Sequence, residues 1–141
     1  MNNKIIGYTT GVFDLFHIGH LNILKRAKEQ CDYLIVGVST DELVKEYKNK
    51  VPIIPYNERK SIVEAIRYVD KVVPQETRDK LAAWEKYRFD KMFVGDDWKG
   101  SELFNNLEVK FKTRNVDIIY FPYTKGTSST YLRSVLDSLK K

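Results

Sequence analysis

Short apolar runs alternate with amphipathic segments along most of the chain. Five of the runs are rich in β-branched and aromatic residues, as short strands buried on both faces are. They cover residues 4–10, 33–39, 71–73, 91–94 and 116–121. Four intervening segments carry apolar residues at spacings of three and four, which predicts helices. They cover residues 18–29, 58–67, 78–86 and 101–113.

Alternating strands and helices predict right-handed crossovers and a parallel sheet with helices on both faces. The 141 residues contain no internal repeat, low-complexity tract or linker, so we expect one domain over residues 1–141. The expected fold is an α/β, Rossmann-like domain with a five-stranded parallel sheet in the order 3-2-1-4-5. Ligands of such sheets bind beyond the carboxyl ends of the strands, which makes the loops after the first, fourth and fifth strands the candidate site.

The longest predicted connection covers residues 45–56, with the sequence KEYKNKVPIIPY. It contains two prolines, three lysines and a short apolar stretch. Connections of this length in a compact domain are usually functional or disordered. We interpret the segment as a mobile basic lid, and an ordinary surface loop is the alternative.

Composition limits the classes of protein that this chain can be. Apolar residues make up 43% and charged residues 30%, and no apolar run approaches the roughly 20 residues that cross a bilayer. The first residues show no signal-peptide pattern, and the lone Cys31 cannot form an internal disulfide. We therefore expect a cytoplasmic protein that does not act at a membrane.

The formal net charge of +5 indicates an anionic partner. The basic residues are dispersed and are not interleaved with aromatic residues as in nucleic-acid-binding surfaces. Small phosphorylated ligands are therefore favoured over RNA or DNA.

Both histidines of the chain lie in one segment, GVFDLFHIGH, directly after the first predicted strand. A helix starting near Ile18 would bring His17 and His20 together beside unpaired N–H groups and a positive helix end. This arrangement predicts a phosphate site, and Gly19 would permit close approach of the ligand. The alternatives are two packing histidines, or a zinc site that lacks its other ligands.

Two further loops carry candidate chemistry. Asp96 and Asp97, in GDDWKG, could contact a base, a ribose or a metal, and Trp98 could lie beside the ligand. The alternative is a polar turn with an aromatic plug. The hydroxyl-rich segment 124–130 precedes a predicted helix and is longer than an N-cap requires, although an ordinary cap is the simpler reading.

These motifs resemble a known family. HIGH, after a strand ending in Gly-x-Phe-Asp, resembles the His-x-Gly-His signature of the nucleotidyltransferase superfamily. The blocks TGVFDLFHIGHLNILKRAKEQCDYLIVGVSTDE, NERKSIVEAIRYVDKVVP, FVGDDWKG and the terminal Gly-Ser-Thr segment together resemble the glycerol-3-phosphate cytidylyltransferases over nearly the whole chain.

The resemblance implies an enzyme that joins CTP and an alcohol phosphate, with glycerol-3-phosphate as the expected acceptor. A phosphate oxygen of the acceptor would attack the α-phosphorus of CTP, giving CDP-glycerol and pyrophosphate for cell-wall or capsular polymers. The resemblance also implies Mg²⁺ bound with the triphosphate, no dedicated metal site on the protein, and a homodimer.

The same resemblance assigns roles residue by residue. The catalytic residues are His17, His20, Lys50 and Arg59. The nucleotide-binding residues are Thr10, Gly11, Phe13, His17, His20, Lys48, Asp96, Thr124, Ser128, Ser129, Thr130 and Arg133. The acceptor-binding residues are Asp14, Lys48, Arg59 and Trp98. The lysine loop is one residue longer than the family pattern, which leaves the choice between Lys48 and Lys50 open, and Arg67 and Asp70 match positions near the nucleotide or form a structural ion pair.

The chain departs from the family at Tyr123 and Lys125, where those enzymes have arginine and glutamate. Another phosphorylated capsule precursor is therefore the alternative acceptor. Related branches use ATP with FMN or phosphopantetheine, and a nucleotide sensor or RNA-binding module is the non-enzymatic alternative.

Overall fold

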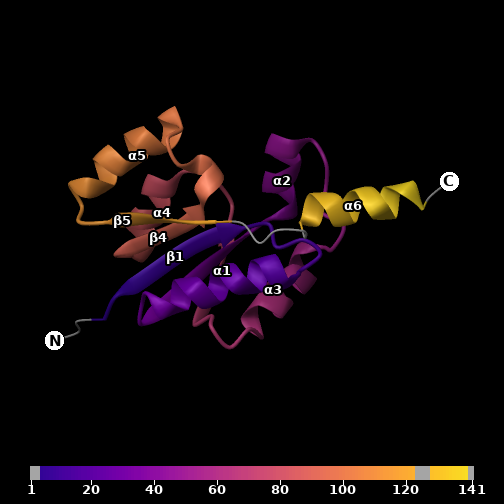
Figure 1. Cartoon of the computed structure of the whole chain (residues 1–141), viewed down its shortest axis with the longest axis horizontal. Helices are drawn as coiled ribbons and strands as arrows, with labels where there is room; N and C mark the ends of the chain where they lie inside the picture. Colours follow the sequence, from indigo (N-terminus) through magenta and orange to yellow (C-terminus); the bar gives the residue numbers. More distant parts are fainter. Residues whose placement is uncertain (1–3, 123–127, 140–141) are drawn as a thin grey trace.

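The computed structural model describes residues 4–122 and 128–139, in which one parallel sheet forms the centre (Figure 1). Its strands are β1 (Ile6–Gly11), β2 (Tyr33–Ser39), β3 (Lys71–Gln75), β4 (Lys91–Gly95) and β5 (Asp117–Phe121). They are ordered β3-β2-β1-β4-β5, and every neighbouring pair is parallel. The predicted sheet is confirmed, including its order.

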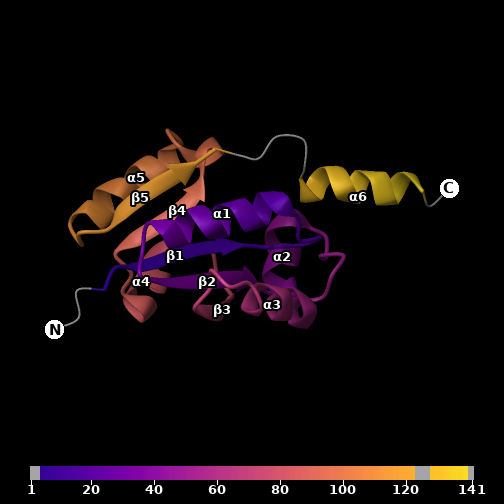
Figure 2. The same cartoon turned by 60° about the horizontal axis from the view of Figure 1, so that its bottom comes forward.

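Helices cover both faces of the sheet (Figures 1 and 2). They are α1 (Ile18–Glu29), α2 (Asp41–Lys48), α3 (Tyr56–Glu64), α4 (Lys80–Tyr87), α5 (Glu102–Lys112) and α6 (Ser129–Ser138), with a short 3₁₀ turn, η1, at Asp96–Trp98. The apolar residues of α1 and α3 pack with one face of the sheet, and those of α4 and α5 pack with the other.

Alternation along the buried strands builds the two apolar layers. In β2, Leu34 and Val36 face the α1 side, whereas Ile35 faces the α4 and α5 side. In β4, Phe93 faces the α1 side and Met92 faces the α4 and α5 side. The strands therefore read as continuous apolar runs, as expected for a sheet buried on both faces.

The predicted long connection is partly wrong. Its first residues belong to α2, which is capped by the Thr40 side chain and ends at Asn49 in the left-handed conformation, with φ of 55°. Asn tolerates this conformation better than most residues, so the helix ends there. The connection that remains covers residues 49–55 and lies at the carboxyl end of the sheet.

Helix α6 differs from the other helices in its packing. It begins beside the carboxyl end of β1 and then projects away from the sheet (Figures 1 and 2). None of its residues is buried, and Tyr131, Leu136 and Leu139 keep apolar side chains exposed.

Candidate active site

A cavity of about 910 Å³ opens at the carboxyl ends of the strands. Its walls come from the loop after β1, the helices α2, α4 and α5, the turn η1, and the start of α6. The lining includes these predicted site residues: Thr10, Gly11, Phe13, Asp14, His20, Lys48, Lys50, Trp98, Ser129, Thr130 and Arg133. The structure thus brings together groups from opposite ends of the sequence.

The two histidines cap helix α1 with one ring nitrogen each. Gly19 donates its backbone N–H to Nδ1 of His17 at 3.0 Å, and His17 donates its own N–H to Nδ1 of His20 at 3.1 Å. A neutral imidazole whose Nδ1 accepts carries its proton on Nε2. The helix cap therefore leaves each histidine with an Nε2–H donor for a ligand, and the two rings stack at 3.9 Å.

The electrostatics keep both rings neutral near pH 7. Burial lowers the pKa of His17. Burial, together with the nearby His17, lowers the pKa of His20 to about 4, although Asp14 opposes this shift. Neutral imidazoles donate hydrogen bonds without needing to gain or lose a proton during turnover.

The backbone of the histidine loop is strained. Phe13 has φ of 56° and Leu15 has φ of 50°, both in the left-handed region that bulky residues rarely adopt. Such strain is characteristic of sites where the surrounding structure fixes the chain. Asp14, between the two, is buried.

The start of α6 meets this loop. Ser129 donates its hydroxyl to the Asp14 backbone carbonyl at 2.5 Å, and its Oγ lies 3.5 Å from Nε2 of His20. Ser128 caps α6 by accepting the Tyr131 N–H at 3.0 Å. The ordinary capping role predicted for the hydroxyl segment is therefore real for Ser128, while Ser129 and Thr130 face the cavity.

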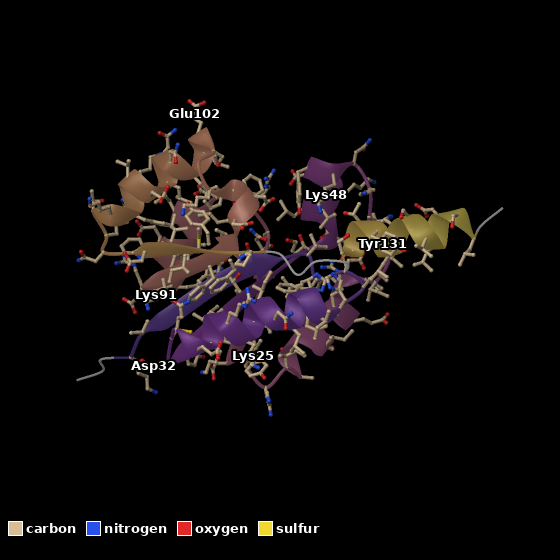
Figure 3. The ribbon with its side chains drawn as sticks, viewed as in Figure 1. Lys25, Asp32, Lys48, Lys91, Glu102 and Tyr131 are labelled. Carbon is tan, nitrogen blue, oxygen red and sulfur yellow. The ribbon has the colours of Figure 1, made fainter. Side chains whose placement is uncertain are left out.

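Cations gather around Lys48, which ends α2 and is labelled in Figure 3. Burial lowers the pKa of Lys48, and the positive charges of Lys50, Arg78 and Arg133 lower it further, against the single opposing effect of Asp14. Arg78 also lies over the Tyr47 ring at 4.5 Å. A cluster in which cations repel one another is stabilised by an anion, and phosphate is the ligand that such a cluster favours.

Arg59 does not reach the cavity. Its side chain is fully buried, and its guanidinium donates to the carbonyls of Val12, Ser39 and Ile54 at 2.7 to 2.8 Å. Nη2 also pairs with Asp41 at 2.6 Å. The geometry therefore does not support the predicted contact between Arg59 and the acceptor phosphate, because the carbonyls occupy its donors.

The opposite wall of the cavity is largely apolar. Leu103, Phe104 and Leu107 of α5 line it, together with Leu81 of α4. Trp98 lies at its edge, 5.3 Å from the Phe104 ring.

A family model described as cytidylyltransferase-like matches residues 8–135, which is most of the chain. The chain belongs to the cytidylyltransferase-like family. The match includes both the histidine loop and the start of α6, the two segments that meet at the cavity.

Two kinds of curated relative match most of the chain. The chain is 40% identical over 137 residues to the glycerol-3-phosphate cytidylyltransferase of Bacillus spizizenii, covering 96% of this chain and 98% of that protein. It is also 39% identical over 127 residues to the FAD synthase of Pyrococcus abyssi, covering 86% and 83%.

Among solved structures, a lipopolysaccharide core biosynthesis protein from Thermoplasma volcanium aligns with a TM-score of 0.72 and 26% identity. The alignment covers 89% of this chain and all of that chain. The predicted membership of the nucleotidyltransferases is thus confirmed, and the shared fold extends over almost the whole domain.

Several predicted residues of this cytidylyltransferase-like site fall outside the cavity lining. Asp97 lines the cavity where Asp96 was predicted to do so, and His17 and Ser128 are not among the lining residues. Thr124, with the departures at Tyr123 and Lys125, lies outside the described residues. Asp70 has a structural role, but with Lys28 at 2.6 Å and the Leu34 N–H as its partners, whereas Arg67 contacts Tyr68.

Lys80 is the main residue that sequence reasoning missed. Its Nζ donates to Oγ1 of Thr10 at 3.0 Å inside the cavity. Burial, aided by Arg78, lowers the pKa of Lys80 to about 8. A lysine at the first position of a helix looks solvent-exposed in sequence, and only the packing of α4 beside β1 turns it into the cavity.

Residues 4–122 and 128–139 contain no group of three or more His, Cys, Asp or Glu side chains that could hold a metal ion. Within the same residues, no helix is long and apolar enough to cross a membrane.

Proposed function

We propose that the protein transfers the cytidylyl group of CTP to glycerol-3-phosphate, releasing pyrophosphate and forming CDP-glycerol. The observation that carries this proposal is the convergence of His20, Ser129 and Arg133 in one cavity that is also lined by lysines. The first three fit a triphosphate, and the lysines fit a second phosphate. The glycerol-3-phosphate cytidylyltransferase relative supports the choice of nucleotide and acceptor.

In this mechanism a phosphate oxygen of the acceptor attacks the α-phosphorus of CTP. The bond from the α-phosphorus to the bridging oxygen breaks as the new bond forms, and that oxygen leaves with pyrophosphate. No protein nucleophile is required, so the site contributes alignment and charge stabilisation. The Nε2–H donors of His17 and His20 stabilise the oxygens of the α-phosphate as negative charge develops there.

The cations bring two anionic substrates together. Lys48, Lys50 and Lys80 would offset the repulsion between the acceptor phosphate and the triphosphate. Ser129, Thr130 and Arg133 would hold the β- and γ-phosphates, which positions pyrophosphate for departure.

Mg²⁺ is proposed as a companion of the triphosphate. Because the described residues form no metal-ligand cluster, the phosphate oxygens and water would supply its ligands. When bound, the ion would neutralise charge on the phosphates. The role of the protein is to receive the complex on the donors and cations named above.

The proposal is tested by measuring pyrophosphate release with each of the four nucleoside triphosphates against a panel of phosphorylated acceptors. Turnover that requires both CTP and glycerol-3-phosphate supports it. Turnover with CTP and a different phosphorylated alcohol would keep the cytidylyl transfer and replace the acceptor. Binding of CTP without pyrophosphate release would favour a nucleotide sensor.

A second candidate is adenylyl transfer from ATP to FMN. Two observations favour it: the FAD synthase relative at 39% identity, and the apolar cavity wall formed by Leu81, Leu103 and Leu107. Glycerol has little apolar surface to place against such a wall, whereas a flavin ring does. Pyrophosphate release with ATP and FMN, but not with CTP and glycerol-3-phosphate, would establish this candidate instead.

We further infer that two copies of the chain associate through α6. The helix leaves Tyr131, Val135, Leu136 and Leu139 exposed, with Leu139 at 74% exposure. A second copy would bury these side chains. We also infer a cytoplasmic location, where CTP is available, and use of CDP-glycerol in building cell-wall or capsular polymers.

A further inference from the structure

The loop of residues 49–55 is held to the histidine loop by the Asp14 carboxylate. Oδ2 accepts the backbone N–H of Ile53 at 2.8 Å, and Oδ1 accepts the N–H of Ile54 at 2.9 Å. Asp14 is only 7% exposed. Both carboxylate oxygens are thus bonded to a loop about 40 residues away in sequence.

Arg59 holds the same loop from the other side. Its Nε donates to the Ile54 carbonyl at 2.8 Å, while Nη1 donates to Val12 and Ser39. Asp41, paired with Arg59, also accepts the N–H of Tyr56 at 3.3 Å. A single buried guanidinium therefore ties the loop to the carboxyl ends of two strands.

A third contact comes from α6. Arg133 donates to the Val51 carbonyl at 3.0 Å, and it lies 3.8 Å from the Asp14 carboxylate. The side chains of Val51 and Ile53 are exposed, at 53% and 37%. Apolar burial of these two residues therefore contributes little, so that the buried Pro52 and the polar contacts together fix the loop.

The lysines lie at the amino-terminal end of this loop. Lys48 ends α2 directly before the loop, and Lys50 is the second loop residue; both line the cavity. Long, flexible side chains reach a substrate productively only when the backbone that carries them is fixed. A free carboxylate beside the phosphates would instead repel them.

We propose that Asp14 is a positioning residue: its carboxylate, with Arg59, clamps the loop of residues 49–55 so that Lys48 and Lys50 face the substrate phosphates. Asp14 thus acts through the lysines and does not bind the acceptor. The kinetic consequence rests on the proposed function, whereas the clamp itself does not.

The clamp is tested by amide hydrogen exchange at Ile53 and Ile54 in the wild type and in Asp14→Asn. The variant turns one acceptor into a donor that faces an N–H, so exchange at these amides should accelerate about tenfold or more. Asp90→Asn is the matched control, because Asp90 accepts the Ile6 N–H at the opposite end of the sheet. It should leave exchange at Ile53 and Ile54 unchanged.

Kinetics then separate positioning from direct binding. Asp14→Asn and a Lys48→Ala/Lys50→Ala variant should each lower kcat/KM for the acceptor, and adding Asp14→Asn to the lysine variant should lower it by no more than about twofold further. If the two losses instead multiply while exchange at Ile53 and Ile54 stays slow, Asp14 binds substrate and the proposal is overturned.

The clamp can still be tested if the variant does not fold or if the proposed function is wrong. If Asp14→Asn does not fold, the wild type still decides, since exchange at Ile53 and Ile54 as fast as in an unstructured peptide would overturn the clamp. If the wild type releases no pyrophosphate from CTP and glycerol-3-phosphate, the proposed function fails while the exchange measurements still test the clamp.

Discussion

At both ends of the parallel sheet, aspartate carboxylates accept backbone N–H groups, but these hydrogen bonds serve different purposes at the two ends. At the amino ends, Asp32 accepts the N–H of Ile5 at 2.8 Å and Asp90 accepts the N–H of Ile6 at 2.9 Å. At the carboxyl ends, Asp14 accepts two N–H groups from the loop of residues 49–55. The first pair closes the start of a strand, whereas Asp14 holds a loop beside a cavity.

The difference lies in the surrounding charges. At the amino ends, lysines find partners: Lys28 pairs with Asp70 at 2.6 Å, and Lys91 donates to the Gln30 carbonyl at 3.1 Å. At the carboxyl ends, Lys48 lies near Lys50, Arg78 and Arg133, whose positive charges lower its pKa. The lysines at the amino ends thus have partners within the protein, whereas the cations at the carboxyl ends would be stabilised by an anion. A site that transfers phosphate groups is therefore expected at the carboxyl ends.

The largest effect should come from the histidine loop. His20→Ala should lower turnover by about 10²–10⁴-fold, because one Nε2–H donor to the α-phosphate is lost. His17→Asn is a sharper companion, since asparagine can still cap α1 while the Nε2–H is removed. Pyrophosphate release measures both, with circular dichroism as the control for folding; near-normal turnover in His20→Ala would remove the histidines from the mechanism.

The next effect concerns Lys80 and pH. Its pKa of about 8 in the free enzyme means that the ammonium loses its charge as pH rises through 8, so acceptor kcat/KM should fall above that pH. The limiting slope should be about tenfold per pH unit if the charge is essential. Lys80→Arg, which remains charged, should abolish this descent. An unchanged profile in Lys80→Arg would show that another group titrates.

A smaller effect should separate the two ends of the sheet. Asp90→Asn should lower the free energy of unfolding by about 1 kcal/mol, because the Ile6 N–H loses a charged acceptor. Turnover should be unchanged, since this end of the sheet is remote from the cavity. Urea unfolding and pyrophosphate release measure the two quantities, and a large loss of turnover in a folded variant would contradict the division.

The smallest effect should come from Asp70. Burial raises its pKa, but the Lys28 ammonium and the Leu34 N–H outweigh burial and lower it. The stabilisation is therefore present above the ordinary value of about 4 and is lost as pH falls through the depressed pKa. Lys28→Met should cost about 0.2–1 kcal/mol at pH 7 and less in acid. A loss of unfolding free energy in Lys28→Met that grows as the pH falls would contradict this prediction.

The fold was predictable because its signals are strong and local. Runs such as residues 33–39 are continuously apolar, and α1 ends at Glu29 as the spacing predicts. Helix α2 was missed because it is only eight residues long, and its buried Leu43 and Val44 are adjacent and not spaced by three or four.

The site was predictable only in part, for a physical reason. The histidines stand in a sequence motif, so their role can be predicted before the fold is known. Arg59 was predicted to bind the acceptor, but it is buried and donates to backbone carbonyls and Asp41. Lys80 was not predicted as a site residue, but its side chain points into the cavity. Sequence carries no direct signal of either orientation.

The central claim is that the histidine loop and the start of α6 hold one triphosphate between them. A structure of the protein with CTP bound tests this directly. The α-phosphate should lie within hydrogen-bonding distance of Nε2 of His17 and His20, with the β- and γ-phosphates at Ser129, Thr130 and Arg133. A triphosphate bound elsewhere, out of reach of both segments, would contradict the account.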